Sequence, residues 1–172
     1  MKKLILIGYM GCGKSTISVE LSKKLKIPAV DLDQIIEKNQ NLSVQKIFET
    51  KGELFFRKLE NQLFTELILS NEQMIISTGG GTPCYFNNHL LLKNDGVISI
   101  YLKASIETLF SRLKNNVKNR PLLSNFDEIE AKEFIAKHLF ERNYYYNQAS
   151  KTVIVDHLTV AEVVNEISST LT

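Results

Sequence analysis

The chain has 172 residues, of which 44% are hydrophobic and 23% are charged, and its formal net charge is only +2. This length and composition fit one globular domain with a hydrophobic core, so we expect a single domain over residues 1–172. A charge this small, with no run of like charges, argues against a protein that binds nucleic acid or another polyanion.

The sequence contains nothing that we would read as a membrane or export segment. The apolar run near the N-terminus is only four residues long, and Gly-Cys-Gly-Lys follows where a secretory signal would remain apolar. No segment approaches the length needed to cross a bilayer. The two cysteines, Cys12 and Cys84, stand alone without metal-ligand spacing. We therefore expect a cytoplasmic protein that contacts neither a membrane nor nucleic acid.

Apolar patterning predicts strands that alternate with helices along the chain. Short apolar runs predict strands at 3–7, 28–32, 74–77, 96–102 and 152–155. Helical spacing predicts helices at 14–25, 54–69, 86–93, 105–113, 127–146 and 160–171, and one or two short helices at 35–48 that break near 39–41. The segment 114–125 is polar and aperiodic and contains Pro121, so we predict a loop there. This alternation indicates an α/β layer fold with a mostly parallel sheet.

The first predicted strand runs into the segment Gly8-Tyr-Met-Gly-Cys-Gly-Lys14-Ser15, which matches the phosphate-loop pattern G-x-x-x-x-G-K-[ST]. Glycines let the backbone turn tightly, so that successive N–H groups point inward, and the following helix adds its positive end. Lys14 would reach the β- and γ-phosphates, and the Ser15 hydroxyl would ligate Mg²⁺. A chance glycine-rich turn is the alternative, but the strand before and the helix after favour a phosphate site.

Two carboxylates, Asp31 and Asp33, end the second predicted strand. In open α/β sheets, ligands bind in the crevice at the carboxyl ends of the strands. One aspartate that caps the next helix is the structural alternative. Beside a phosphate loop, we expect one carboxylate in the metal shell and one at the hydroxyl group that accepts the phosphate.

The third predicted strand is followed by three glycines, Gly79-Gly80-Gly81. Three consecutive glycines cost chain entropy, so we expect a ligand to come close to this backbone. A bare turn is the alternative.

Only four of the 21 basic residues are arginines: Arg57, Arg112, Arg120 and Arg142. A chain that otherwise uses lysine is expected to keep arginine where a planar, bidentate guanidinium is needed. Arg120 lies in the aperiodic loop and is predicted to close over the phosphates. Arg57 and Arg142 lie on predicted helices, where a surface salt bridge is the alternative role.

These segments, taken in order, resemble shikimate kinases. The resemblance covers about residues 3–167 and is carried by Gly8–Ser15, Asp31-Leu-Asp33, Ile47-Phe48, Gly52-Glu-Leu-Phe-Phe-Arg57, Glu60, Gly79–Gly81, Arg120-Pro-Leu-Leu123, and Arg142 with Tyr145. It implies a P-loop kinase fold: a three-layer sandwich with a five-stranded parallel sheet and a mobile lid at about 114–125. It also implies transfer of phosphate from MgATP to the 3-hydroxyl of shikimate, in the route to chorismate and the aromatic amino acids.

The resemblance further implies a role for each site residue. ATP would be bound by Gly11, Cys12, Gly13, Lys14, Ser15, Thr16, Arg112 and Arg120. Shikimate would be held by Asp33, Arg57, Gly79, Gly80, Gly81 and Arg142, with Arg57 and Arg142 on its carboxylate. Catalysis would depend on Asp33, Lys14 and Arg120. One Mg²⁺ per subunit would be bound directly by Ser15 and through water by Asp31.

Two other functions remain open on the sequence. Another small-molecule kinase of the same fold, such as a gluconate or nucleotide kinase, would lack a carboxylate site made by Arg57 and Arg142. A nucleotide-dependent switch protein would bind without turnover and would not need Asp33, Arg57 and Gly79–Gly81 to converge. We expect a monomer whose partners are the small molecules shikimate and ATP.

Overall fold

Five parallel strands form one sheet in the computed structural model, which describes residues 2–114 and 126–171. The strands are β1 (Lys3–Ile7), β2 (Ala29–Asp31), β3 (Met74–Ser77), β4 (Val97–Lys103) and β5 (Lys151–Ile154). Their order in the sheet is β2-β3-β1-β4-β5, and every neighbouring pair is parallel. The central strand β1 is buried along its whole length, as expected for a parallel sheet covered on both faces. The predicted five-stranded parallel sheet is confirmed.

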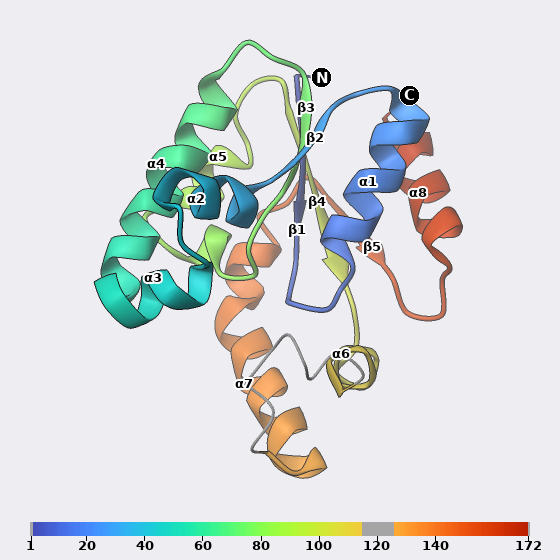
Figure 1. Cartoon of the computed structure of the whole chain (residues 1–172). Coiled ribbons are helices and arrows are strands. Elements are labelled where there is room, and N and C mark those ends of the chain that lie inside the picture. The colour runs from blue at the N-terminus through green and yellow to red at the C-terminus, as the bar shows by residue number, and fades with distance from the viewer. Residues whose placement is uncertain (1, 115–125, 172) are drawn as a thin grey trace.

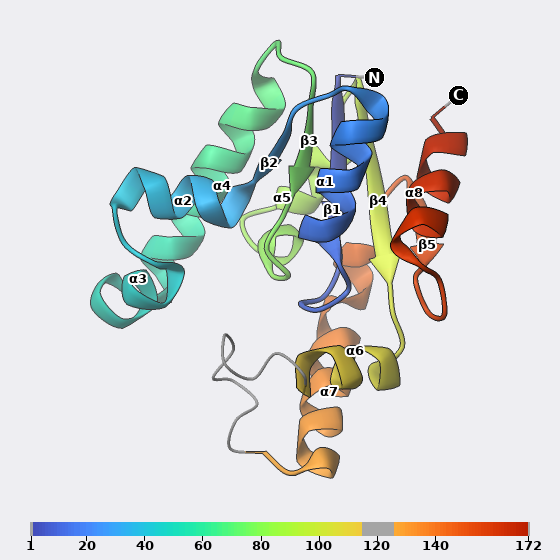
Figure 2. The ribbon, with the colours of Figure 1, turned by 45° about the vertical axis from the view of Figure 1, so that its right-hand side comes forward.

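Helices cover both faces of this sheet and complete the three layers (Figure 1). Helices α1 and α8 lie side by side on one side, while α4 and α5 lie on the other, and the turned view agrees (Figure 2). The helices are α1 (Lys14–Leu25), α2 (Leu32–Gln40), α3 (Val44–Lys51), α4 (Glu53–Leu69), α5 (Asn88–Leu91), α6 (Ile106–Lys114), α7 (Glu128–Tyr146) and α8 (Val160–Ser169), with a 3₁₀ turn η1 (Thr82–Cys84). None of the helices in these described ranges is long and apolar enough to cross a membrane.

The predicted break in the 35–48 segment lies between α2 and α3. Asn41, directly after α2, has a left-handed backbone with φ of 51°, which ends the helix. Ser43 then starts α3 by accepting a hydrogen bond from the N–H of Lys46.

The helix predicted at 86–93 is much shorter in the structure, because α5 covers only Asn88–Leu91. Phe86 and Asn87 have φ values of 48° and 60°, and this left-handed conformation cannot continue into a right-handed helix. The prediction of a helix beginning at residue 86 is therefore wrong.

The carboxyl ends of β1, β2 and β3 lie at one edge of the sheet, since all three strands run parallel. The phosphate loop follows β1, the aspartate pair lies at the end of β2, and the three glycines follow β3. Of the predicted lid at 114–125, Lys114 is the last residue of α6 and the remainder, with Arg120, lies outside the described residues.

Candidate active site

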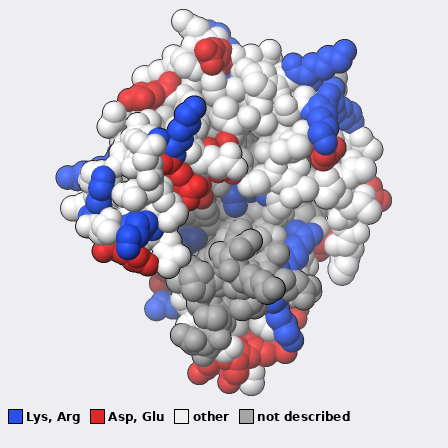
Figure 3. Space-filling view, viewed as in Figure 1, with Lys and Arg blue, Asp and Glu red and all other residues white. Residues whose placement is uncertain are grey.

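A cavity of about 580 Å³ opens at this edge of the sheet. In Figure 3 the cavity is visible as a hollow near the centre of the molecule, with acidic and basic side chains at its margin. The lining includes the predicted site residues Gly11, Cys12, Gly13, Lys14, Ser15, Thr16, Asp31, Asp33, Gly79, Gly80 and Arg112. The structure therefore brings the phosphate loop, the aspartate pair and the first glycines after β3 to one cavity.

The phosphate loop needs glycine at both of its ends. Gly8 has a φ of 143°, and a Cβ at this position would lie 2.7 Å from the carbonyl oxygen of Leu102. Gly13, which precedes α1, has a φ of 104°. The buried Lys14 side chain folds back over the loop, where its Nζ donates to the carbonyl oxygens of Gly8 at 2.8 Å and Tyr9 at 3.0 Å. Its ammonium group is thus fixed at the point where phosphates would enter the loop.

Arg112 connects α6 to the phosphate loop. Its Nη1 donates to the carbonyl oxygens of Gly11 at 3.4 Å and Cys12 at 3.2 Å, and its Nη2 donates to that of Val155 at 3.4 Å. The guanidinium therefore lies between the loop and the end of β5.

The wall beyond Arg112 is apolar and was not predicted from the sequence. It is formed by Val155, Leu158, Val160 and Val163, which come from the segment between β5 and α8 and from α8 itself. Asp156 holds this segment in place because its carboxylate accepts hydrogen bonds from the N–H and hydroxyl of Ser105. Small aliphatic residues carry no motif, so only the fold reveals that they face the cavity.

Asp31 caps the next helix, which is the structural alternative that the sequence left open, and it also contacts the phosphate loop. Its Oδ1 accepts hydrogen bonds from the N–H groups of Asp33 at 3.0 Å and Gln34 at 3.3 Å, which caps α2. Its Oδ2 accepts a hydrogen bond from the Oγ of Ser15 at 3.0 Å. A hydroxyl and a carboxylate side by side are the hard oxygen donors that suit Mg²⁺.

The second carboxylate, Asp33, is half-buried and has an unusual acidity. Burial raises the pKa of Asp33 to about 6, and the negative charges of Asp31 and Glu60 act in the same direction. The positive charges of Lys14 and Arg57 oppose the shift without cancelling it. Asp33 is therefore ionised at neutral pH and still a better base than an ordinary aspartate.

The turn Gly79–Gly81 lies against three of the predicted acceptor-binding side chains. A Cβ on the first glycine would lie 3.1 Å from the Oδ1 of Asp33, and one on the second would lie 3.5 Å from the Nη1 of Arg142. A Cβ on the third glycine would lie 2.6 Å from the Nη2 of Arg57. The bare backbone thus leaves space for one carboxylate and two guanidinium groups to converge.

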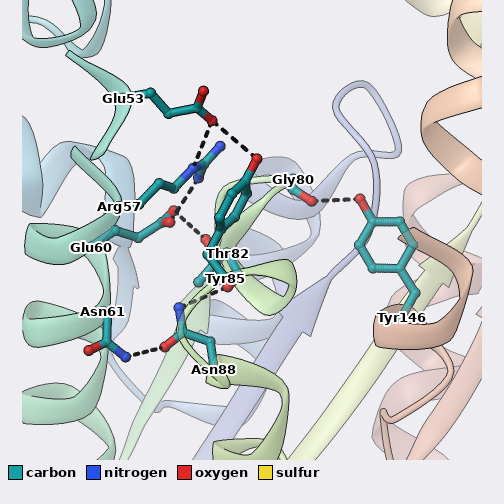
Figure 4. A network of polar contacts seen from close by, with 9 residues as sticks. All are labelled: Glu53, Arg57, Glu60, Asn61, Gly80, Thr82, Tyr85, Asn88 and Tyr146. Atoms are coloured by element: carbon teal, nitrogen blue, oxygen red, sulfur yellow. Dashed lines mark hydrogen bonds and ion pairs between the residues drawn. The ribbon is translucent and has the colours of Figure 1, made fainter. Parts of the chain in front are cut away.

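The side chain of Arg57 is largely shielded from solvent, unlike that of a surface salt-bridge residue. Only 12% of its side chain is exposed, and its Nη1 donates to the Oε2 of Glu60 at 2.8 Å (Figure 4). Glu60 is fully buried, and its other oxygen accepts a hydrogen bond from the Oγ1 of Thr82 at 2.7 Å. The sequence assigned no role to Glu60, although a carboxylate one turn after Arg57 on an otherwise apolar helical face was a usable signal.

Arg142 reaches the same turn from α7. Its guanidinium lies 5.5 Å from the centre of the Tyr9 ring and shares a hydrogen bond with the side chain of Tyr146. The Tyr146 hydroxyl in turn donates to the carbonyl oxygen of Gly80 at 2.6 Å (Figure 4). Tyr146 is fully buried, whereas the resemblance drew on its neighbour Tyr145 and gave Tyr146 no role.

Comparison with known proteins gives one consistent result. A family model described as shikimate kinase matches residues 10–172. A shikimate kinase from Flavobacterium johnsoniae is 59% identical over 167 residues, which are 97% of this chain and 97% of that protein. The crystal structure of shikimate kinase from Bacteroides thetaiotaomicron has a TM-score of 0.90 at 32% identity, covering 98% of this chain and 97% of that one. A shikimate kinase from Acinetobacter baumannii, solved in complex with shikimate, has a TM-score of 0.88 at 28% identity, covering 99% and 93%. This chain belongs to the shikimate kinase family.

Proposed function

We propose that this protein transfers the γ-phosphoryl group of ATP to the 3-hydroxyl of shikimate, giving shikimate 3-phosphate and ADP on the route to the aromatic amino acids. The observation that carries the proposal is the convergence of Asp33, Arg57 and Arg142 on the Gly79–Gly81 turn, beside the phosphate loop. The relative solved in complex with shikimate supports the same acceptor.

ATP would occupy the cavity with its phosphates on the loop. The N–H groups of Gly11 to Thr16 and the ammonium of Lys14 would bind the phosphate oxygens. The base would pack between the guanidinium of Arg112 and the apolar wall at Leu158 and Val160. For Arg120 we retain the proposal that it neutralises charge on the transferring phosphoryl group.

Ser15 and Asp31 would hold a magnesium ion, Ser15 directly and Asp31 through water. The 3.0 Å hydrogen bond between them fits this role, because both oxygens point to one place at the phosphate end of the cavity. When bound, Mg²⁺ neutralises charge on the β- and γ-phosphate oxygens.

Asp33 would orient the acceptor hydroxyl and accept its proton. Its pKa of about 6 suits a base that is ionised at neutral pH and still able to take a proton. Phosphoryl transfer passes through a loose transition state, so the nucleophile bonds late and positioning matters more than basicity.

Arg57 and Arg142 would bind the carboxylate of shikimate. Two guanidinium groups on one carboxylate give charge-assisted hydrogen bonds of fixed direction, which a lysine cannot reproduce. Both groups are already held in place, Arg57 by Glu60 and Arg142 by Tyr146. The site would therefore select an acidic acceptor.

We also propose that residues 1–172 form one domain that acts as a monomer in the cytoplasm. The free thiols of Cys12 and Cys84 fit a reducing compartment.

Acceptor-dependent ADP release from the full chain with MgATP tests the activity. Shikimate is expected to accelerate ADP release strongly, whereas gluconate and nucleoside monophosphates leave it at the acceptor-free rate. Faster release with gluconate or a nucleotide would point to another kinase of the same fold. Tight ATP binding with no acceptor-dependent release would point to a nucleotide switch.

A further inference from the structure

Tyr85 covers the guanidinium group of Arg57. The centre of its ring lies 4.2 Å from the Cζ of Arg57, and its hydroxyl donates to the Oε1 of Glu53 at 3.1 Å. The same oxygen of Glu53 lies 3.5 Å from the Nε of Arg57. Tyr85, Glu53 and Arg57 therefore form a closed set of contacts, which Figure 4 shows at the end of α4 nearest the glycine turn.

The tyrosine is the nearest aromatic ring to this cation. Phe56 and Phe48 also face Arg57, but their ring centres lie at 5.1 Å and 6.0 Å from its Cζ. A cation–π contact is strongest when the cation is shielded from water, and the Arg57 side chain is only 12% exposed. Of these three aromatic rings, that of Tyr85 therefore constrains the plane of the guanidinium most strongly.

The backbone directly after Tyr85 takes an unusual conformation, whereas Tyr85 itself is extended. The next two residues, Phe86 and Asn87, both have positive φ values, 48° and 60°. A left-handed conformation in a non-glycine residue persists only where the surroundings enforce it, and such positions gather at functional sites. Two left-handed residues in succession indicate that the direction of this turn, and with it the position of Tyr85, serves the site.

Two asparagines, of which Asn88 is buried and Asn61 partly buried, hold this turn in place. Asn88 is fully buried, and its Nδ2 donates to the carbonyl oxygen of Thr82 at 2.8 Å while its N–H donates to that of Tyr85 at 2.9 Å. The Oδ1 of Asn88 accepts a hydrogen bond from the Nδ2 of Asn61, on α4, at 2.8 Å. Helix α4 therefore holds both Arg57 and the turn that places Tyr85 over it (Figure 4).

We propose that Tyr85 is a positioning residue for acceptor binding, which fixes the Arg57 guanidinium in the orientation that receives the acceptor's carboxylate; this inference rests on the proposed function. Glu60 holds Nη1, Glu53 lies at Nε, and the Tyr85 ring covers one face. The remaining nitrogen, Nη2, faces Gly81 and the acceptor site. Tyr85 thus sets the affinity for an acidic acceptor without touching the phosphate end.

Steady-state kinetics of Tyr85→Leu, Tyr85→Phe and Tyr144→Leu test the proposal. Tyr85→Leu is expected to raise the KM for shikimate by roughly 3- to 30-fold, the range of a shielded cation–π contact, with the KM for ATP changed less than about 2-fold. Tyr85→Phe keeps the ring and loses one hydrogen bond, so the expected rise is about 2- to 5-fold. Tyr144→Leu is the matched control, because Tyr144 is largely exposed on α7, and it should change neither constant.

A double-mutant cycle separates positioning from direct contact or loss of structure. If Tyr85 acts through Arg57, adding Tyr85→Leu to Arg57→Ala should change the KM for shikimate by less than about 2-fold. The inference would be overturned if Tyr85→Leu raised the KM for shikimate as much in the Arg57→Ala variant as in the wild type. It would also be overturned if Tyr85→Leu alone raised both KM values equally or left the KM for shikimate unchanged. Wild-type enzyme that fails to phosphorylate shikimate would overturn the proposed function as well, and this outcome is seen before any variant is measured.

Discussion

Gly81 lies so close to Arg57 that no side chain fits between them: a Cβ on this glycine would be 2.6 Å from Nη2 and 3.0 Å from Cζ. The backbone of Gly81 is ordinary, with φ of −93° and ψ of −13°, a helical-region conformation open to any residue. Glycine is therefore needed here for the space it leaves and not for its conformational freedom.

Gly81→Ala should consequently damage acceptor binding without damaging the fold. The methyl group would displace the guanidinium, and we expect the KM for shikimate to rise at least about 10-fold, as for loss of a charge-assisted hydrogen bond. The free energy of unfolding in urea should change by less than about 1 kcal/mol, because alanine fits these backbone angles.

Gly96→Ala is the matched control for this substitution. Gly96 has a φ of 79° and precedes β4, at the opposite end of the sheet from the site. Alanine there should reduce stability by about 1 kcal/mol and leave both KM values unchanged. A loss of stability without a kinetic effect in Gly81→Ala would contradict our interpretation of that glycine.

Changing either Arg57 or Arg142 to lysine should weaken shikimate binding specifically. Lysine keeps the charge and loses the planar fork, so we expect the KM for shikimate to rise about 10- to 100-fold while the KM for ATP moves less than about 2-fold. Shikimate methyl ester, which lacks the anionic carboxylate, provides the chemical control. The ester should be a poor acceptor for the wild type and lose little more in the variants; a large further loss would place the arginines elsewhere on the substrate.

The pH dependence of turnover should report Asp33. The carboxylate must be ionised to accept the proton of the acceptor hydroxyl, and its pKa lies near 6. The value of kcat/KM for shikimate should therefore fall about tenfold per pH unit below pH 6. Asp33→Asn should remove this acidic limb and lower kcat by about 10²- to 10⁴-fold. An acidic limb that persists unchanged in Asp33→Asn would assign it to another group.

The sequence predicted the fold well where the signal is local. Strand β1 and helix α1 repeat the simplest patterns, a continuous apolar run and apolar residues at helical spacing, and the glycine-rich loop between them has a fixed spacing. The place of Asp31 and Asp33 followed from the rule that ligands bind at the carboxyl ends of parallel strands.

What the sequence did not predict depends on contacts between distant residues. The left-handed turn at Phe86 is enforced by the hydrogen bond from Asn61 to Asn88, which no local pattern encodes. The same holds for Tyr146, whose hydroxyl reaches a carbonyl 66 positions earlier in the chain. Propensity is a weak guide at such positions because tertiary packing overrides it.

The observed capping role of Asp31 and its proposed metal role can be separated by substitution. Asparagine still caps a helix, so Asp31→Asn should keep the stability of the wild type within about 0.5 kcal/mol, whereas Asp31→Ala should lose about 1 kcal/mol. Both variants lack the carboxylate, and both should need several-fold more Mg²⁺ for half-maximal activity. Titration of activity with Mg²⁺ and urea unfolding measure the two effects. A normal Mg²⁺ requirement in Asp31→Asn would limit this residue to capping.

Asp33 should also make the wild type less stable at high pH than it would be with a neutral residue. Its pKa in the folded state, about 6, lies above the value of about 3.9 expected in the unfolded chain. The folded state therefore binds the proton more tightly, so the stabilisation is fully present below about pH 4 and is lost as pH rises through 6. Two pKa units correspond to at most about 3 kcal/mol, and this net value already includes the attraction of the ionised carboxylate to Lys14 and Arg57.

Asp33→Asn is accordingly expected to be more stable than the wild type by about 1–2 kcal/mol at pH 8 and by much less at pH 4. Urea unfolding at both pH values measures the difference, and Asp95→Asn on the exposed turn before β4 serves as the control that should change little at either. Asp33→Asn should nevertheless be nearly inactive, because the burial that destabilises the ionised carboxylate also raises its basicity. A variant that is less stable than the wild type at pH 8 would mean that Lys14 and Arg57 stabilise the ionised carboxylate by more than its burial costs.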